Sequence, residues 1–143
     1  MKKNEAAITL EIIFSCSPKK LWEALTQVQQ MRKWYFENIE DFKAEVNFIT
    51  SFDVHTKDKI FRHQWTVIEA INQKRLVYNW KYPDYEGDAN VCFELSQIPE
   101  GTSLNFSMEI LEDFDDGIPE FKREMCVGGW DYFLKDRLVN FLK

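Results

Sequence analysis

Residues 118–141 read IPEFKREMCVGGWDYFLKDRLVNF, and the apolar pattern of this stretch sets the expected architecture. At about 100° per residue, its apolar side chains fall into two stripes on roughly opposite sides of one helix. One stripe contains Cys126, Trp130, Phe133, Leu134 and Phe141, and the other contains Phe121, Met125, Gly128, Gly129, Tyr132 and Val139. A helix with apolar residues on two sides has to be buried on both. We therefore expect a long helix over Ile118–Phe141 that is wrapped by a curved sheet.

Upstream of this helix, residues 41–111 show β-branched and aromatic runs between polar turns and no helical period, which is typical of antiparallel strands. Six strands are expected here, over Phe42–Ala44, Asn47–Val54, Phe61–Ala70, Leu76–Lys81, Ala89–Gln97 and Thr102–Leu111. The alternation in Ala6–Phe14 predicts one further strand. Two short helices should follow it, one from Ser17-Pro18, a favourable helix start, and one over Gln29–Trp34. The sequence thus predicts an α+β chain with a seven-stranded sheet.

The residues just before the long helix are acidic. Asp113, Asp115 and Asp116 carry negative charges that favour the positive end of a helix dipole. Their pattern faintly resembles a calcium-binding loop, but the spacing differs and the downstream bidentate glutamate is missing. We interpret the acidic run as helix capping and expect no metal or cofactor.

Length and composition bound the class of protein. A chain of 143 residues fits one domain over residues 1–143, because two domains would each lack a sufficient core. A net charge of −6 without a basic stripe argues against nucleic acid as a partner, and no run approaches the ~18 apolar residues of a membrane span. Cys16, Cys92 and Cys126 lack any paired spacing suited to zinc or redox chemistry. We interpret them as reduced thiols of a soluble, cytoplasmic protein.

The order of expected elements resembles the helix-grip fold, which START-like and birch-pollen-allergen-like (SRPBCC) domains share. Specific residues are similar to one bacterial branch, which is related to the C-terminal domain of the heat-shock chaperone ATPase activator. The matching motifs cover nearly the whole chain and are Ser17–Thr26 (SPKKLWEALT), Trp34, Arg75–Trp80 (RLVYNW), Val91–Leu95 (VCFEL), Gly101-Thr102, Gly129-Trp130 and Leu134. The resemblance implies a pocket between helix and sheet. It does not assign a function, because members of this superfamily do unrelated jobs.

Two positions depart from the family pattern. Where the family commonly has a glycine before the third strand, this chain has Val46-Asn47. Asparagine tolerates the left-handed conformation best after glycine, so we expect the turn to persist. The second departure is Trp65, where relatives often carry a small residue. If the Trp65 side chain points inward, it reduces or reshapes the cavity.

The first functional hypothesis is a binding module for a small hydrophobic or amphipathic molecule. Its motivation is an aromatic content of 15%, more than a core of this size usually holds. Such pockets are mostly apolar with a few oriented polar groups, and His63 and Tyr78 could supply these. The expected lining is Trp34, Phe48, Phe52, His63, Trp65, Tyr78, Trp80, Phe106, Met108, Met125 and Gly129.

Several residues that could serve a ligand site also have a simple structural explanation. Large aromatics such as Trp22 and Trp34 mostly fill cores, a lone histidine is usually structural, and Cys126 behaves as a small hydrophobic residue. Gly128 and Gly129 each cost about 1 kcal/mol inside a helix relative to alanine. The two glycines therefore indicate either a notch for a ligand or close packing on a strand.

Two other functions stay open. Some START-like relatives are enzymes of the cyclase or hydratase kind, and in this chain His63 or Tyr78 could handle protons inside the cavity. Eukaryotic members of the named branch act on a chaperone through a partner domain. The third hypothesis is therefore a chaperone-interacting domain.

Overall fold

A six-stranded antiparallel sheet, in the order β1-β6-β5-β4-β3-β2, forms the frame of the protein in the computed structural model, which describes residues 1–143. The strands are β1 (Ile8–Phe14), β2 (Ile49–His55), β3 (Ile60–Ile71), β4 (Arg75–Lys81), β5 (Asp88–Ile98) and β6 (Gly101–Glu112). The helices α1 (Pro18–Thr26) and α2 (Val28–Trp34) lie between β1 and β2, and α3 (Arg123–Trp130) and α4 (Leu138–Phe141) follow β6. None of the helices combines the length and the apolar character that a membrane crossing requires.

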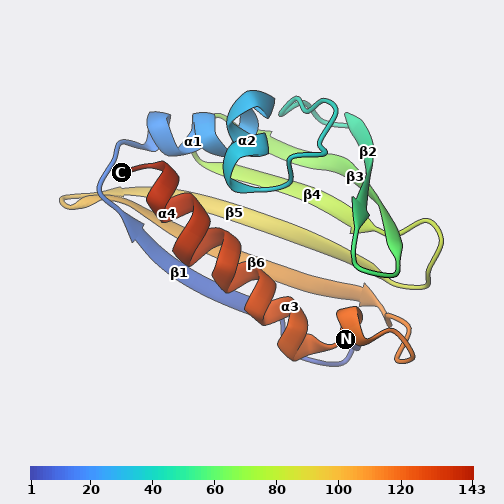
Figure 1. Cartoon of the computed structure of the whole chain (residues 1–143). Coiled ribbons are helices and arrows are strands. Elements are labelled where there is room, and N and C mark those ends of the chain that lie inside the picture. The colour runs from blue at the N-terminus through green and yellow to red at the C-terminus, as the bar shows by residue number, and fades with distance from the viewer.

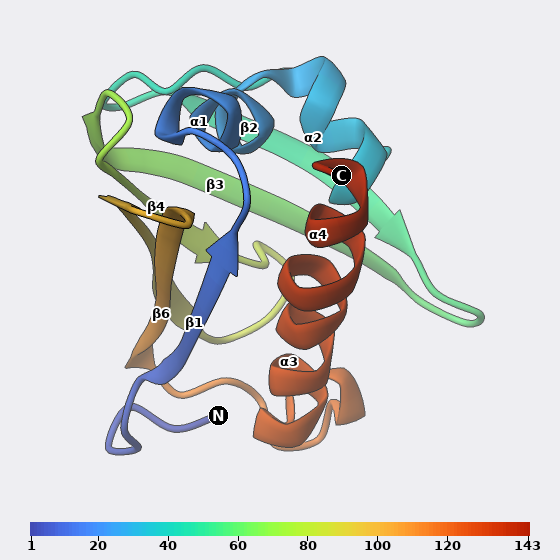
Figure 2. The ribbon, with the colours of Figure 1, turned by 90° about the vertical axis from the view of Figure 1, so that its left-hand side faces the viewer.

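The sheet is curved, and the C-terminal helix runs across its open side (Figures 1 and 2). The helices α1 and α2 close the end of this arrangement at which the chain terminates, where Lys20 Nζ donates to the carbonyl of Leu142 at 3.4 Å. The Ser17 hydroxyl accepts a hydrogen bond from the Lys20 backbone N–H at 3.2 Å, which confirms the predicted helix start. The α+β helix-grip architecture is confirmed, with six strands where seven were predicted.

The strand predicted at Phe42–Ala44 does not form. The Phe42 N–H donates to the Asp41 carboxylate at 2.8 Å instead of to a neighbouring strand. The Phe42 side chain is buried, and its ring packs edge-on against Trp65 and Tyr78. Asn47 then adopts a φ of 74°, so the left-handed turn predicted at Val46-Asn47 is confirmed. The segment is held by one buried ring rather than by a ladder of backbone hydrogen bonds.

The C-terminal helix begins at Arg123, not at Ile118. Residues Pro119–Phe121 form a separate 3₁₀ turn (η1), and Lys122 is extended with φ −71° and ψ 145°. Phe121 is buried and its ring stacks on Tyr82 at 4.7 Å between centroids, which anchors η1 independently of α3. After α3, a π-helical segment, η2 (Asp131–Arg137), continues into α4.

Only one side of this helix is buried, so the prediction of two buried sides is wrong. The stripe that contains Trp130 and Leu134 faces the core, and both side chains are buried. On the opposite stripe Met125 is 56% exposed, Tyr132 is 49% exposed and Gly128 is also exposed. Gly128 adds no side chain to this stripe and Tyr132 carries a polar hydroxyl, so these positions can face solvent without a large free-energy penalty.

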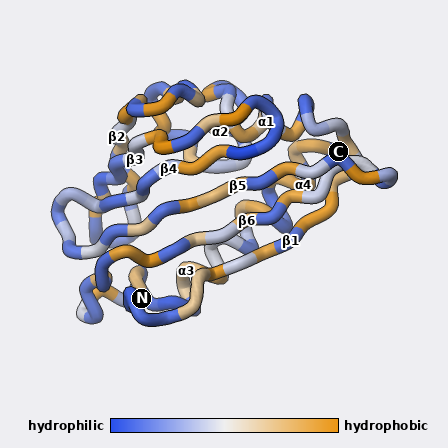
Figure 3. The backbone as a smooth tube through the Cα atoms, turned by 180° about the vertical axis from the view of Figure 1, so that it is seen from behind, coloured by the Kyte–Doolittle hydropathy of each residue, from blue (hydrophilic) through white to orange (hydrophobic).

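The strands follow the alternation expected of a sheet with one face on the core. In β5, Val91 and Phe93 are buried whereas Glu94 is exposed. Figure 3 shows the same alternation of hydrophobic and hydrophilic residues along the strand from behind. The inward face of the sheet therefore supplies the side chains that meet the C-terminal helix.

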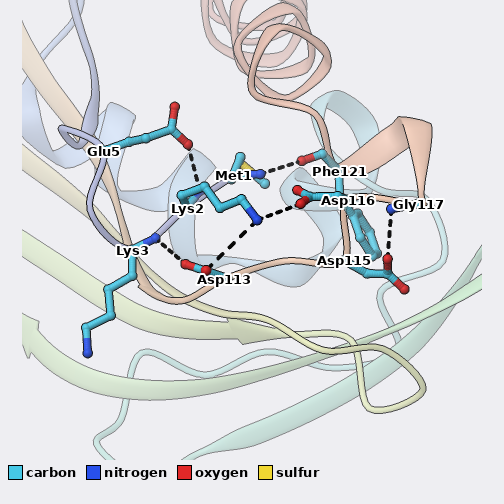
Figure 4. A network of polar contacts seen from close by, with 9 residues as sticks. All are labelled: Met1, Lys2, Lys3, Glu5, Asp113, Asp115, Asp116, Gly117 and Phe121. Carbon is cyan, nitrogen blue, oxygen red and sulfur yellow. Dashed lines mark hydrogen bonds and ion pairs between the residues drawn. The ribbon is translucent and has the colours of Figure 1, made fainter.

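The acidic run before η1 binds the first residues of the chain instead of capping a helix (Figure 4). Lys2 Nζ lies 2.6 Å from Asp116 and 4.0 Å from Asp113, and the Met1 amino group donates to the carbonyl of Phe121 at 3.1 Å. The predicted capping role is wrong because six residues, including the 3₁₀ turn, separate Asp116 from Arg123. These contacts hold Met1 against the end of the space between helix and sheet.

Candidate functional site

The interior between helix and sheet is filled at the end near α1 and α2. The Tyr35 ring stacks on Trp34 at 4.5 Å and on Trp65 at 5.3 Å between centroids. The hydroxyls of Tyr35 and Tyr78 share a hydrogen bond of 2.8 Å, and burial raises the pKa of both, which keeps them neutral. Trp65 has no exposed surface. Its side chain therefore points inward and fills space that a smaller residue would leave open.

A cavity of about 210 Å³ remains beside the first half of the C-terminal helix. The sheet side contributes Phe61, His63, Trp80, Tyr82 and Met108. The helix side contributes Glu120, Phe121, Met125, Cys126, Gly129, Trp130 and Phe133, and Met1, Phe36 and Thr56 complete the wall. Among these, Thr56 and Met125 are exposed, so they lie at the mouth of the cavity.

The principal polar side chain deep in this wall is His63. Its Nδ1 lies 3.0 Å from the Phe61 carbonyl oxygen, which can only accept, so Nδ1 carries the proton of the neutral ring. Nε2 therefore holds a lone pair, and it has no hydrogen-bond partner in the protein. Phe52 stacks on the imidazole at 5.0 Å and Tyr82 meets it edge-on at 4.7 Å, so the ring has little freedom to turn.

Burial lowers the pKa of His63 to about 4. The hydrogen bond to the Phe61 carbonyl and the negative charge of Asp53 act in the opposite direction but do not overcome the loss of hydration. His63 is therefore uncharged at neutral pH. The cavity offers a neutral hydrogen-bond acceptor, not a cation.

Tyr82 and Trp80 add polar atoms to an otherwise apolar wall. Burial raises the pKa of the Tyr82 hydroxyl, which stays protonated. The Trp80 indole N–H offsets part of this increase, yet it makes no hydrogen bond of good geometry and is buried without a partner. At the mouth, Glu120 pairs with Lys59 at 2.8 Å, and this hydrogen bond lowers the pKa of the glutamate.

Sulfur atoms line one side of the cavity. Three of the four methionines, Met1, Met108 and Met125, contribute to it, together with Cys126. Cys126 Sγ donates to Met108 Sδ at 3.5 Å, and burial raises the pKa of this thiol to about 11. Cys126 is therefore a protonated thiol, and thioethers provide a soft wall that adapts to ligand shape.

The two helix glycines differ in their surroundings. A Cβ atom built on Gly128 or Gly129 would meet no heavy atom within 4 Å, so the interpretation as close packing on a strand is wrong. Gly129 lines the cavity, whereas Gly128 is exposed and does not. The absence of a side chain at Gly129 keeps part of the cavity open.

The structure brings together some of the predicted lining residues and separates the others. Those that line the cavity are His63, Trp80, Met108, Met125 and Gly129. Those that lie outside it are Trp34, Phe48, Phe52, Trp65, Tyr78 and Phe106. Of this second group, Trp34 donates its indole N–H to the Ala24 carbonyl at 2.7 Å, Phe48 is half-buried, and the rest are buried in the core.

Several lining residues lie outside the predicted set, among them Phe36, Phe61, Tyr82 and Trp130. A signal for Tyr82 was present in the sequence, because it continues the alternation of Tyr78 and Trp80. No group of three or more His, Cys, Asp or Glu side chains is arranged to hold a metal ion.

The curved sheet, the helix across it and the cavity between them define a START-like helix-grip domain. The family model described as "Activator of Hsp90 ATPase homolog 1-like protein" matches residues 15–143. The chain belongs to this family. No curated protein matches the chain.

Solved structures share the fold over nearly the whole chain. A protein from Chromobacterium violaceum has 20% identity and a TM-score of 0.80, with 95% of this chain and 96% of that chain covered. One from Mesorhizobium loti has 26% identity and a TM-score of 0.73, with 96% of each chain covered. A solution structure from Bacillus halodurans has 20% identity and a TM-score of 0.73, with coverages of 97% and 98%. The structural similarity supports the fold, and at these low sequence identities it does not assign an activity.

Proposed function

We propose that this protein binds a small, largely apolar molecule in the cavity between the C-terminal helix and the sheet. The observation that carries the proposal is a cavity of about 210 Å³ whose wall is mainly aromatic and sulfur-containing and encloses one buried polar ring, His63. Small-molecule sites typically combine such an apolar wall with a few placed polar groups.

The size of the cavity limits the ligand. An apolar cavity of about 150 Å³ holds one benzene molecule, so 210 Å³ accommodates one ring with a few substituent atoms. This volume is smaller than the roughly 300–1,000 Å³ of typical ligand sites. A long-chain lipid would have to extend through the mouth beside Met125. We therefore favour a compact ligand over a lipid.

The two adjacent glycines provide a matched test. Gly129→Leu places four carbon atoms into the cavity, whereas Gly128→Leu places the same atoms outside it. Both substitutions remove a helix glycine, so both should improve helix stability similarly. Binding of p-xylene, followed by calorimetry or by ligand-observed NMR, should be saturable in the wild type and in Gly128→Leu and absent in Gly129→Leu. Failure of p-xylene to bind the wild type, or equal binding by both variants, contradicts the proposal.

The other two hypotheses have less support. A general base works best when its pKa is near the operating pH, and a His63 pKa of about 4 makes its Nε2 a weak base at neutral pH. The chaperone hypothesis rests on the family description alone. Neither is therefore proposed.

A further inference from the structure

His63 Nε2 is an acceptor in the cavity wall that makes no hydrogen bond within the protein and that its surroundings hold in a fixed place. The residue is 4% exposed, so bulk water reaches little of it. Its other nitrogen is committed to the Phe61 carbonyl at 3.0 Å, and a flip of the ring would break that bond. A ligand that fills the cavity takes Nε2 out of contact with water, which carries a free-energy penalty unless the ligand donates a hydrogen bond to this nitrogen.

The surroundings of His63 select against charge on the ligand. The wall around it is formed by Phe36 at 5.1 Å, Trp80 at 5.3 Å and the edge-on ring of Tyr82 at 4.7 Å between centroids. The two cations at the cavity already have partners, since Lys59 pairs with Glu120 at the mouth and the Met1 amino group donates to the Phe121 carbonyl. A carboxylate would lose its hydration and would meet the lone pair of Nε2, so both effects oppose its binding.

We propose that the ligand is a neutral single-ring molecule bearing one hydrogen-bond donor, such as a phenol, which donates to His63 Nε2 while its ring lies against Trp80, Phe133 and the Gly129 notch. This inference rests on the proposed function and narrows it to a chemical class. Aliphatic hydrocarbons of the same size fill the space but leave Nε2 without a partner. The acceptor therefore determines specificity, and the apolar wall determines affinity.

The test compares two ligands of the same shape. In p-cresol a hydroxyl replaces one methyl group of p-xylene, so the ratio of their dissociation constants isolates the donor. His63→Asn keeps a side-chain N–H for the Phe61 carbonyl but removes the acceptor at the position of Nε2. His63→Gln places an amide oxygen near that position and should restore part of the preference. Binding of p-xylene reports in every variant that the cavity is intact.

In the wild type, we expect p-cresol to bind at least as tightly as p-xylene. In His63→Asn the preference for p-cresol should fall by about tenfold, because its hydroxyl is then buried without an acceptor. His55→Asn, at an exposed position outside the cavity, should leave the preference unchanged. If His63→Asn does not fold, the ¹⁵N resonance of His63 Nε2 in the wild type gives the answer, since it must move when p-cresol binds and not when p-xylene binds.

The outcomes separate the two proposals. If p-xylene binds but the cresol preference is the same in the wild type and His63→Asn, the inference about His63 is wrong and the binding function stands. The inference is also overturned if the Nε2 resonance does not respond to bound p-cresol. If neither compound binds the wild type, the proposed function itself fails.

Discussion

Lowering the pH from 7 to 5 should destabilise this protein through one residue, His63. An unfolded histidine has a pKa near 6.5, whereas burial lowers the pKa of folded His63 to about 4. Between these two values the unfolded chain binds a proton that the folded chain does not. Stability therefore falls as the pH drops below 6.5, and the loss is complete once the pH is below 4.

The size of the effect follows from the two pKa values. At pH 5 the unfolded histidine is almost fully protonated and the folded one is mostly neutral, which costs about 2 kcal/mol of unfolding free energy relative to pH 7. Below pH 4 the total approaches roughly 3 kcal/mol. Asp53 favours the protonated ring, but the pKa of about 4 already includes its opposing effect, and Tyr82 is neutral.

The chain contains its own control, because its second histidine, His55, is exposed at the end of β2. Urea unfolding at pH 7 and pH 5 should show a loss of about 2 kcal/mol in the wild type and in His55→Asn. In His63→Asn the loss of unfolding free energy between pH 7 and pH 5 should nearly disappear, whatever the stability of this variant at pH 7. An equal loss in His63→Asn and the wild type would refute the assignment to His63.

Five further substitutions test the packing. Gly128→Ala and Gly129→Ala should each raise the unfolding free energy by about 1 kcal/mol, measured by urea titration, because the added methyl group meets no atom within 4 Å. A decrease at either position would show that the notch is needed for packing. Trp65→Ala should cost about 3–5 kcal/mol and let the cavity accept a two-ring ligand such as naphthalene, which the wild type should exclude in calorimetry. Tyr35→Phe and Tyr78→Phe should each cost about 1–3 kcal/mol, and the double variant should cost less than their sum, because the two hydroxyls satisfy each other. Strict additivity in the double-mutant cycle would contradict that interaction.

The sequence locates the inward face of each strand but not the open part of the interior. His63 and Trp80 were predicted to line the cavity because both lie on an inward-facing position of a strand. The same argument selects Trp65 and Tyr78, which fill the opposite end. Which end stays open depends on where Tyr35 inserts between helix and sheet, and that contact joins residues far apart in the sequence.

The C-terminal helix illustrates a second limit. Helical periodicity predicts the buried stripe that contains Trp130 and Leu134, because that stripe is large and apolar. It does not predict the separate 3₁₀ turn over Pro119–Phe121, which depends on the tertiary packing of Phe121. Nor does it identify Cys126 as a cavity residue, because a small apolar side chain suits a core equally well.

The π-helical segment η2 makes the chain more tolerant of substitution than of deletion at this point. A π turn holds one residue more than an α turn, so loss of a residue from Asp131–Arg137 would allow a regular α-helix. Every later residue would then rotate by about 100°. Leu138 and Leu142, which are buried, would leave the core, and Arg137 would lose its bond to the Lys33 carbonyl. In homologous chains, we expect side chains in this segment to vary while its length stays constant.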